Sequence, residues 1–177
     1  SPVMMLHGAG KREPWYFSDE SLQNYRKFAC LHTDLFPYIY TYAHIASKTG
    51  IPIMRAMVLA FEKEPGIWQP LCEDQYCFGE ELVVAPVHYG FSRVRPVYLP
   101  AGFWRDFWTG ELYQGGREVL CKTDLDEIPV FARTGRKLGV PIGWKPRQAG
   151  ELAVGGGAPV ADQAIDVVRR SEVEIVG

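Results

Sequence analysis

Residues 35–61 read LFPYIYTYAHIASKTGIPIMRAMVLAF, and this stretch decides the fold. Before Gly50, apolar residues recur at steps of three and four, which is the spacing of a helix with one buried face. Gly50, followed by Pro52, is expected to cap the helix in the left-handed conformation, because glycine has no Cβ. Pro37 is expected to kink the helix without ending it. After Gly50 the apolar residues form short runs, so we expect a helical part followed by a β part.

The helical pattern extends upstream to Ser18, which is the expected N-cap residue. Asp19 and Glu20 suit the first turn, where the helix dipole favours negative charge. The predicted buried face consists of Leu22, Tyr25, Phe28, Leu31, Leu35, Ile39, Tyr42, Ala43 and Ala46.

Residues 1–8, SPVMMLHG, form an apolar run that is typical of a buried strand. A buried parallel strand pairs its backbone on both sides, so we expect its neighbours to lie upstream in a longer protein. His7 would lie at the carboxyl end of this strand, where parallel α/β folds build their sites. Two interpretations remain open at this point, a histidine hydrogen-bonded at a strand end and a histidine of a functional site.

Short apolar runs separated by turn residues follow Gly50, and their spacing predicts an antiparallel sandwich or barrel. Prolines within or beside these runs are expected at sheet edges or bulges, where no ladder donor is lost. These prolines are Pro86, Pro96 and Pro129. The expected strands are residues 51–61, 75–78, 82–87, 94–99, 103–108, 117–121 and 128–132.

The composition is that of a globular protein, with 47% hydrophobic and 13% aromatic residues among 177. The net charge of −2 gives no reason to expect nucleic acid or a membrane as a partner. The cysteines follow no paired metal-ligand spacing. Nothing else in the sequence indicates a metal site or a cofactor, so neither is expected. Buried free thiols are the expected state, which is consistent with a reducing, cytoplasmic compartment. The cysteines are Cys30, Cys72, Cys77 and Cys121.

An aromatic cluster near the middle of the β part allows two interpretations, a packed core and a platform for sugar rings. Residues two apart in a strand share a face, so part of the cluster must point inward, which favours the core. Its members are Phe103, Trp104, Phe107, Trp108 and Tyr113.

Charged residues in the β part are expected to have structural roles. Arg55 lies within an apolar run, where it needs a carboxylate or several carbonyl groups, and we expect an ion pair. The acidic pairs 73–74 and 80–81 are expected in solvated turns, because adjacent side chains of an extended chain point in opposite directions.

Several motifs occur in the same order as in a known family. They are LHGAGKREPW at 6–15, the stretch 35–61, DQYCFGEELVVAPV at 74–87, VRPVYLPAGFWRDFWTGELYQGG at 94–116 and DEIPVFARTG at 126–135. Together they resemble the C-terminal part of glycoside hydrolase family 31, the retaining α-glucosidases and α-xylosidases. The resemblance covers residues 1–135.

The resemblance implies an α+β fragment. Residues 1–49 would be the last strand and helix of a (β/α)8 barrel, and residues 50–135 an antiparallel β-sandwich beside it. In the family, the histidine corresponding to His7 hydrogen-bonds the sugar in the subsite where cleavage occurs. Many members carry an arginine two residues earlier, where this chain has Met5.

Retaining hydrolysis uses two carboxylates about 5–5.5 Å apart. In the family both lie on earlier barrel strands, so we expect no catalytic residue in this chain and no hydrolysis by the chain alone. The implied partners are the upstream remainder of the barrel and, through the complete enzyme, an α-glucoside or α-xyloside. The other hypothesis is a stand-alone sandwich that binds carbohydrate through Trp104 or Trp108.

Residues 136–177 depart from the family pattern, because aromatic residues nearly vanish while glycine, alanine and valine increase. This tail is expected to be divergent and poorly ordered, with one short helix over 160–170. A subfamily variation, a frame shift near Gly135 and a junction to unrelated sequence remain as explanations.

Overall fold

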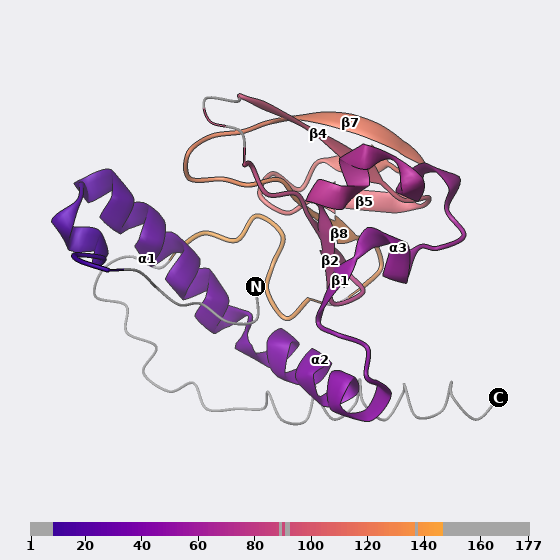
Figure 1. Cartoon of the computed structure of the whole chain (residues 1–177), viewed down its shortest axis with the longest axis horizontal. Helices are drawn as coiled ribbons and strands as arrows, with labels where there is room; N and C mark the ends of the chain where they lie inside the picture. Colours follow the sequence, from indigo (N-terminus) through magenta and orange to yellow (C-terminus); the bar gives the residue numbers. More distant parts are fainter. Residues whose placement is uncertain (1–8, 89, 91–92, 137, 147–177) are drawn as a thin grey trace. The chain divides into compact units, whose positions relative to one another are not determined.

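The computed structural model describes residues 9–88, 90, 93–136 and 138–146 (Figure 1). The strand expected over residues 1–8 and the helix expected over 160–170 lie outside the described residues. The chain divides into two compact units. The helical part of the first unit ends at Ile51, and the second unit begins at Pro52. The second unit runs to Trp144. Each unit is described by itself below.

The first unit contains a 3-10 turn and two α-helices, η1 (Pro14–Tyr16), α1 (Asp19–Asp34) and α2 (Phe36–Thr49). The N-cap prediction is confirmed, because the Ser21 backbone N–H donates to the Ser18 Oγ at 3.1 Å. The C-cap prediction is confirmed as well: Gly50 has φ of 75° and donates its N–H to the Ala46 carbonyl at 2.9 Å. Both ends of the helical region are therefore satisfied by the residues that the sequence indicated.

The prediction of one kinked helix is wrong, because the helical region is interrupted at Leu35. Pro37 lies in the first turn of α2. Proline has no N–H to donate to the preceding turn, and its ring clashes with the carbonyl four residues earlier, so it favours a helix start over a helix interior. The Leu35 N–H still bonds the Leu31 carbonyl, and the Leu35 carbonyl accepts from Ile39, both at 2.9 Å. The break is therefore confined to a single residue.

The second unit contains two antiparallel sheets, in agreement with the predicted β class. One has six strands in the order β1-β2-β3-β8-β5-β6, and the other is the two-stranded ribbon β4-β7 (Figure 1). Pro96 lies in β4, which pairs along one side with β7, so the expected edge position of this proline is confirmed. The strands are β1 (Met54–Ala56), β2 (Tyr76–Phe78), β3 (Leu82–Val84), β4 (Val94–Leu99), β5 (Phe103–Asp106), β6 (Leu112–Gln114), β7 (Arg117–Lys122) and β8 (Val130–Arg133).

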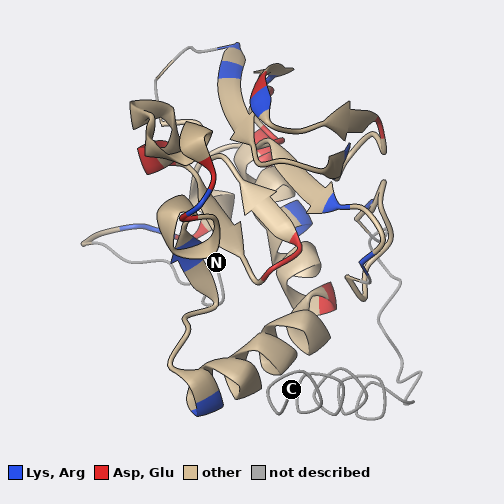
Figure 2. Ribbon diagram, turned by 90° about the vertical axis from the view of Figure 1, so that its right-hand side faces the viewer, with Lys and Arg blue, Asp and Glu red and all other residues tan. Residues whose placement is uncertain are grey.

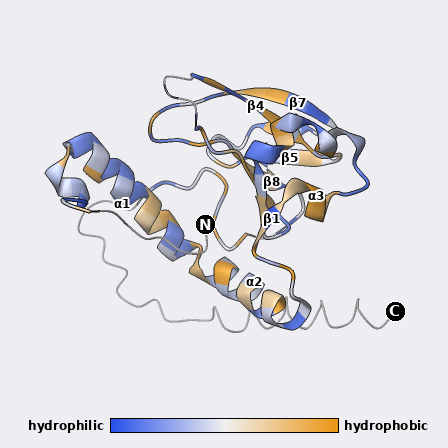
Figure 3. Cartoon of the chain, in the orientation of Figure 1, coloured by the Kyte–Doolittle hydropathy of each residue, from blue (hydrophilic) through white to orange (hydrophobic). Residues whose placement is uncertain are grey.

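The expected strand over 51–61 is correct only for β1, because residues 57–60 form the helix α3 (Met57–Ala60). A short apolar run fits a buried strand and a buried helical turn equally well, so its periodicity could not separate them. Figure 3 shows α3 in the orange of hydrophobic residues, and Met57 is 1% exposed. Two 3-10 helices follow, η2 (Pro65–Trp68) and η3 (Pro70–Asp74).

Both sheets contribute to one hydrophobic core. Val97 and Val119 face each other in the ribbon, and Val83 and Phe131 face each other in the six-stranded sheet. Directly paired residues of antiparallel strands lie on the same face, so each pair presents two apolar side chains together. All four belong to a single cluster of buried residues, which also includes Trp104. The ribbon and the sheet are therefore packed as two layers over a shared interior.

The surface of the described elements carries both signs of charge, with acidic and basic residues interspersed (Figure 2). Among the described helices, none is long and apolar enough to cross a membrane.

Candidate functional site

The residue singled out from the sequence, His7, lies outside the described residues, so its assignment stays a prediction. The described chain begins in the loop that follows it. There Trp15 is 66% exposed, and the Lys11 Nζ lies 4.6 Å from the centroid of the Tyr16 ring. Backbone hydrogen bonds from Glu13 itself and from Arg12 lower the pKa of the Glu13 carboxyl. This loop therefore presents an aromatic ring to solvent and carries a charged carboxylate.

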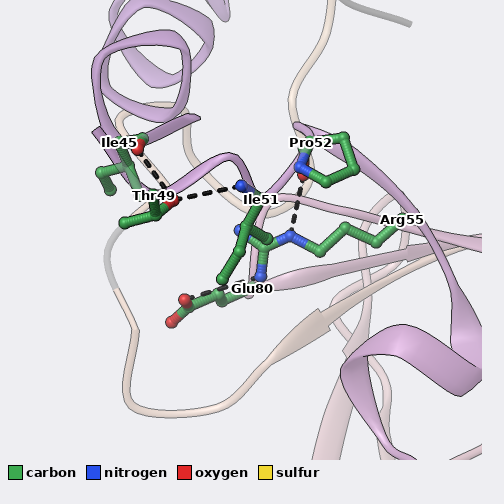
Figure 4. A network of polar contacts seen from close by, with 6 residues as sticks. All are labelled: Ile45, Thr49, Ile51, Pro52, Arg55 and Glu80. Carbon is green, nitrogen blue, oxygen red and sulfur yellow. Dashed lines mark hydrogen bonds and ion pairs between the residues drawn. The ribbon is translucent and has the colours of Figure 1, made fainter. Parts of the chain in front are cut away.

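Arg55 has the ion pair expected from the sequence. Its side chain is buried, its Nη1 lies 3.6 Å from the Glu80 Oε1, and its Nε donates to the Pro52 carbonyl at 2.9 Å (Figure 4). A buried guanidinium with these partners holds β1 to the turn after β2. Arg55 is therefore a structural residue. Figure 4 also shows the Thr49 hydroxyl bonding the backbone of Ile45 and Ile51, at the end of α2.

The acidic pairs differ from each other in their surroundings. Glu73 and Asp74 are exposed, as expected, and the Asp74 Oδ2 lies 3.3 Å from the His88 Nε2. The expectation of a solvated turn is wrong for Glu81, which is 9% exposed although Glu80 is exposed. The Glu81 carbonyl accepts from the Arg133 N–H at 2.7 Å, which fixes this residue against β8. The side chains of these two adjacent residues point in opposite directions, so Glu80 faces solvent while Glu81 faces the interior of the unit.

The aromatic cluster belongs mainly to the core, as the sequence favoured. Trp104 is 1% exposed and its Nε1 donates to the Pro100 carbonyl at 2.8 Å, so it cannot stack on a sugar. Phe107 is 2% exposed. Trp108 is half-buried, and its Nε1 donates to the Ile128 carbonyl at 2.8 Å. The hypothesis of a sugar platform on Trp104 is therefore wrong.

A cleft of about 440 Å³ lies between α3, η2, η3 and the start of β2. Trp68 lines it and is 68% exposed. Gln69, Glu73 and Asp74 also line the cleft and are exposed. Burial raises the pKa of the Tyr76 hydroxyl in the same cleft, so this phenol is a neutral hydrogen-bonding group.

The segment that carries the cleft is held tightly to β4. The buried Gln75 side chain donates to the Tyr98 carbonyl at 2.7 Å and accepts from the Tyr98 N–H at 3.0 Å. The Tyr98 hydroxyl donates to the Glu64 carboxylate at 2.9 Å. Burial, together with this carboxylate, raises the pKa of Tyr98 to about 12, so the phenol keeps its proton near neutral pH. The two ends of the segment are thus tied to one tyrosine.

Three carboxylates of this unit are engaged in structural contacts. Glu64 binds Tyr98, Glu80 pairs with Arg55, and Asp74 pairs with His88. Among the described residues, no three His, Cys, Asp or Glu side chains form a group that could hold a metal ion. The cleft is therefore a concave surface lined by aromatic and polar side chains.

Residues 50–137 match the profile of the glycosyl hydrolase family 31 C-terminal domain. The chain belongs to glycosyl hydrolase family 31. It is 37% identical over 139 residues to an α-xylosidase of Saccharolobus solfataricus, covering 77% of this chain and 19% of that enzyme. It is 34% identical over 148 residues to an isomaltosyltransferase of Sporosarcina globispora, covering 76% of this chain and 13% of the transferase. The chain therefore spans a fifth or less of the length of these relatives.

Solved structures of family 31 enzymes have the same fold over the matched part. A dextranase of Flavobacterium johnsoniae, complexed with glucose, superposes with a TM-score of 0.68 at 38% identity, covering 73% of this chain and 16% of that one. An α-xylosidase from a soil metagenome, complexed with xylose, superposes with a TM-score of 0.67 at 34% identity, covering 73% and 19%. These family 31 enzymes are glycoside hydrolases, and this chain corresponds to a C-terminal portion of such enzymes.

The sequence did not reveal the cleft. Its lining comes from residues 56–76, where Pro65 and Pro70 interrupt any periodic pattern. Leu71 and Cys72 follow Trp68 at steps of three and four, a spacing that favours a buried helical position and not an exposed one. The only signal in the sequence was a large aromatic residue between two turn-forming prolines.

Proposed function

We propose that this chain is the C-terminal part of an α-glycosidase that hydrolyses terminal α-linked glucose or xylose with retention of configuration. The observation that carries the proposal is the 37% identity to an α-xylosidase, which extends over 77% of this chain. The similarity to a dextranase and to an α-xylosidase of known structure supports it. Glucose and xylose are kept together because the relatives include enzymes named for both sugars.

In this proposal residues 1–49 complete the catalytic (β/α)8 barrel, residues 50–135 form the β-sandwich beside it, and residues 136–177 are a divergent tail. The capped end of α2 at Gly50 and the matched range 50–137 support the first boundary. Part of the tail packs with the sandwich, since Leu138 and Trp144 are buried and the Gly143 N–H donates to the Phe107 carbonyl at 2.8 Å.

His7 binds the sugar whose glycosidic bond is cleaved, and the two catalytic carboxylates lie in the barrel upstream. One carboxylate attacks the anomeric carbon and the other protonates the leaving oxygen, so a chain without that pair cannot complete the reaction. The role of His7 is to orient the ring between them by hydrogen bonding. The chain alone is therefore inactive, and the upstream barrel is its obligatory partner.

The proposal is tested by following hydrolysis of a 4-nitrophenyl α-glucoside and α-xyloside by the complete protein with proton NMR. Retention predicts that the α-anomer of the free sugar appears first and then mutarotates. Release of the β-anomer first, or no hydrolysis of either substrate, would contradict the proposal.

The assignment of His7 is tested in the same protein by His7→Ala. Loss of a hydrogen bond that strengthens in the transition state predicts a decrease in kcat/KM of roughly tenfold or more. His44→Ala is the matched control, because His44 is exposed on α2. Equal kcat/KM values for the two variants would remove His7 from the site.

A further inference from the structure

The cleft of the second unit combines three features that suit a sugar ring. Trp68 supplies a large exposed aromatic surface, on which the apolar C–H face of a pyranose can pack. Gln69 and Glu73 are exposed and supply an amide and a carboxylate, which bind hydroxyl groups as donor and acceptor. Pockets that bind small molecules have this composition, an aromatic wall with a few polar groups.

Hydrogen bonds hold the segment that carries Trp68 at both ends, and such restraint reduces the entropy lost when a ligand binds. Gln75 and Glu64 tie the two ends of the segment to Tyr98, as described above. Gly66 lies directly against the Tyr98 ring, where there is no space for a Cβ atom. The buried Cys72 thiol lies 3.5 Å from the Gly66 carbonyl. Trp68 is therefore an exposed ring on a preorganised support.

From these contacts we infer that the cleft is a second carbohydrate site, which binds pyranose units of an α-glucan without cleaving them. Trp68 stacks on the ring, and Gln69, Glu73 and the neutral Tyr76 hydroxyl bind its hydroxyl groups. In the complete enzyme this site holds a polymeric substrate. The inference rests on the proposed function for that role, whereas the binding itself does not depend on catalysis.

The test is affinity electrophoresis of the complete protein in gels that contain dextran or amylose, compared with gels without glucan. The parent protein is expected to be retarded by at least one of these glucans. Trp68→Ala should raise the dissociation constant for that glucan by roughly tenfold, since central aromatic residues dominate such contacts. Trp68→Phe should keep most of the retardation, because it preserves an aromatic ring.

Phe103→Ala is the matched control, because Phe103 is an aromatic residue of the same unit, 54% exposed on β5 and outside the cleft. Retardation caused by the catalytic site is common to all variants, so the difference between the variants reports the cleft. Hydrolysis of a 4-nitrophenyl α-glycoside and the melting temperature should be unchanged by Trp68→Ala.

Three results would overturn the inference: no retardation of the parent by either glucan, equal retardation of the parent and Trp68→Ala, or a parallel loss of hydrolysis or folding in Trp68→Ala. A glucan-dependent difference in proteins that hydrolyse no α-glycoside would support the cleft and refute the proposed function. The two proposals can therefore fail independently.

Discussion

At the scale of single residues, Tyr98 stands out because it contacts several separate segments of the second unit. Its backbone N–H and carbonyl both hydrogen-bond the side-chain amide of Gln75, and its hydroxyl donates a hydrogen bond to Glu64. Its ring lies against Gly66. Backbone groups buried without partners cost roughly 1–3 kcal/mol each, so Gln75 replaces the ladder bonds that β4 lacks at this point. The sequence showed Tyr98 only as one apolar residue of an expected strand.

Gly66→Ala should destabilise the second unit by about 1–3 kcal/mol, because the new methyl group would overlap the Tyr98 ring. The control is Gly90→Ala, where an added Cβ meets nothing within 4 Å. Urea unfolding followed by tryptophan fluorescence measures both changes. Equal stabilities of the two variants would show that Gly66 is not packed against Tyr98.

The thiols of two cysteines make the stability of the second unit sensitive to alkaline pH. Burial raises the pKa of the Cys77 thiol from 9.0 to about 12, and the pKa of Cys121 also rises to about 12. A raised folded-state pKa stabilises the fold fully below the unfolded-state pKa, and this contribution is lost as the pH rises through the folded-state pKa. The free energy of unfolding should therefore decrease between pH 9 and pH 12.

Cys77→Ala should make that decrease shallower by up to about 1.4 kcal/mol per pH unit, the effect of one proton. Urea unfolding at a series of alkaline pH values measures the slope for the parent and the variant. Identical slopes would show that the Cys77 thiol titrates alike in the folded and unfolded chains.

At the scale of elements, the two ends of the helical region were predictable and its interior was not. Ser18 and Gly50 carry local chemistry that needs no knowledge of the fold. Pro37 is compatible with a kink within one helix and with the start of a second helix, so the sequence did not decide the break at Leu35. The short helix α3 depends on how an apolar run packs, which periodicity does not specify. The strand β6 was missed because Leu112–Gln114 is enclosed by glycine-containing turns and is only three residues long.

The contacts of Arg55 with Pro52 and Glu80 join β1 to the β2–β3 turn, and they should not contribute equally to stability. Arg55→Met leaves the Pro52 carbonyl without this donor and should destabilise the unit by about 1–3 kcal/mol. Glu80→Gln should cost less than about 1 kcal/mol, because the Glu80 side chain is exposed. Urea unfolding of both variants tests this order. A larger loss in Glu80→Gln would mean that the ion pair dominates.

At the scale of the whole molecule, the family and its antiparallel sheets were evident from ordered motifs, whereas the cleft was not. The motifs, such as the run from Val94 to Gly116, are continuous stretches of the sequence that can be compared with a family directly. The cleft arises because Gln75 reaches across 23 residues to Tyr98 and folds two 3-10 turns against β4. Such a contact between distant residues leaves no local pattern, so the sequence did not predict the cleft that Trp68, Gln69 and Glu73 line.

In the proposed function, this chain is the non-catalytic C-terminal part of a larger hydrolase. The relatives are at least five times longer than the part that matches, because that part is 19% or less of the α-xylosidase and the isomaltosyltransferase. The catalytic carboxylates and the other barrel strands would lie in the additional length.

The most direct measurement is the intact mass of the native polypeptide that contains this sequence, determined by mass spectrometry after purification through its α-glycosidase activity. We expect a single species several times heavier than 20.0 kDa that yields peptides of this chain. A native species near 20.0 kDa that copurifies with the activity would contradict the account, because hydrolysis would then proceed without the upstream carboxylates.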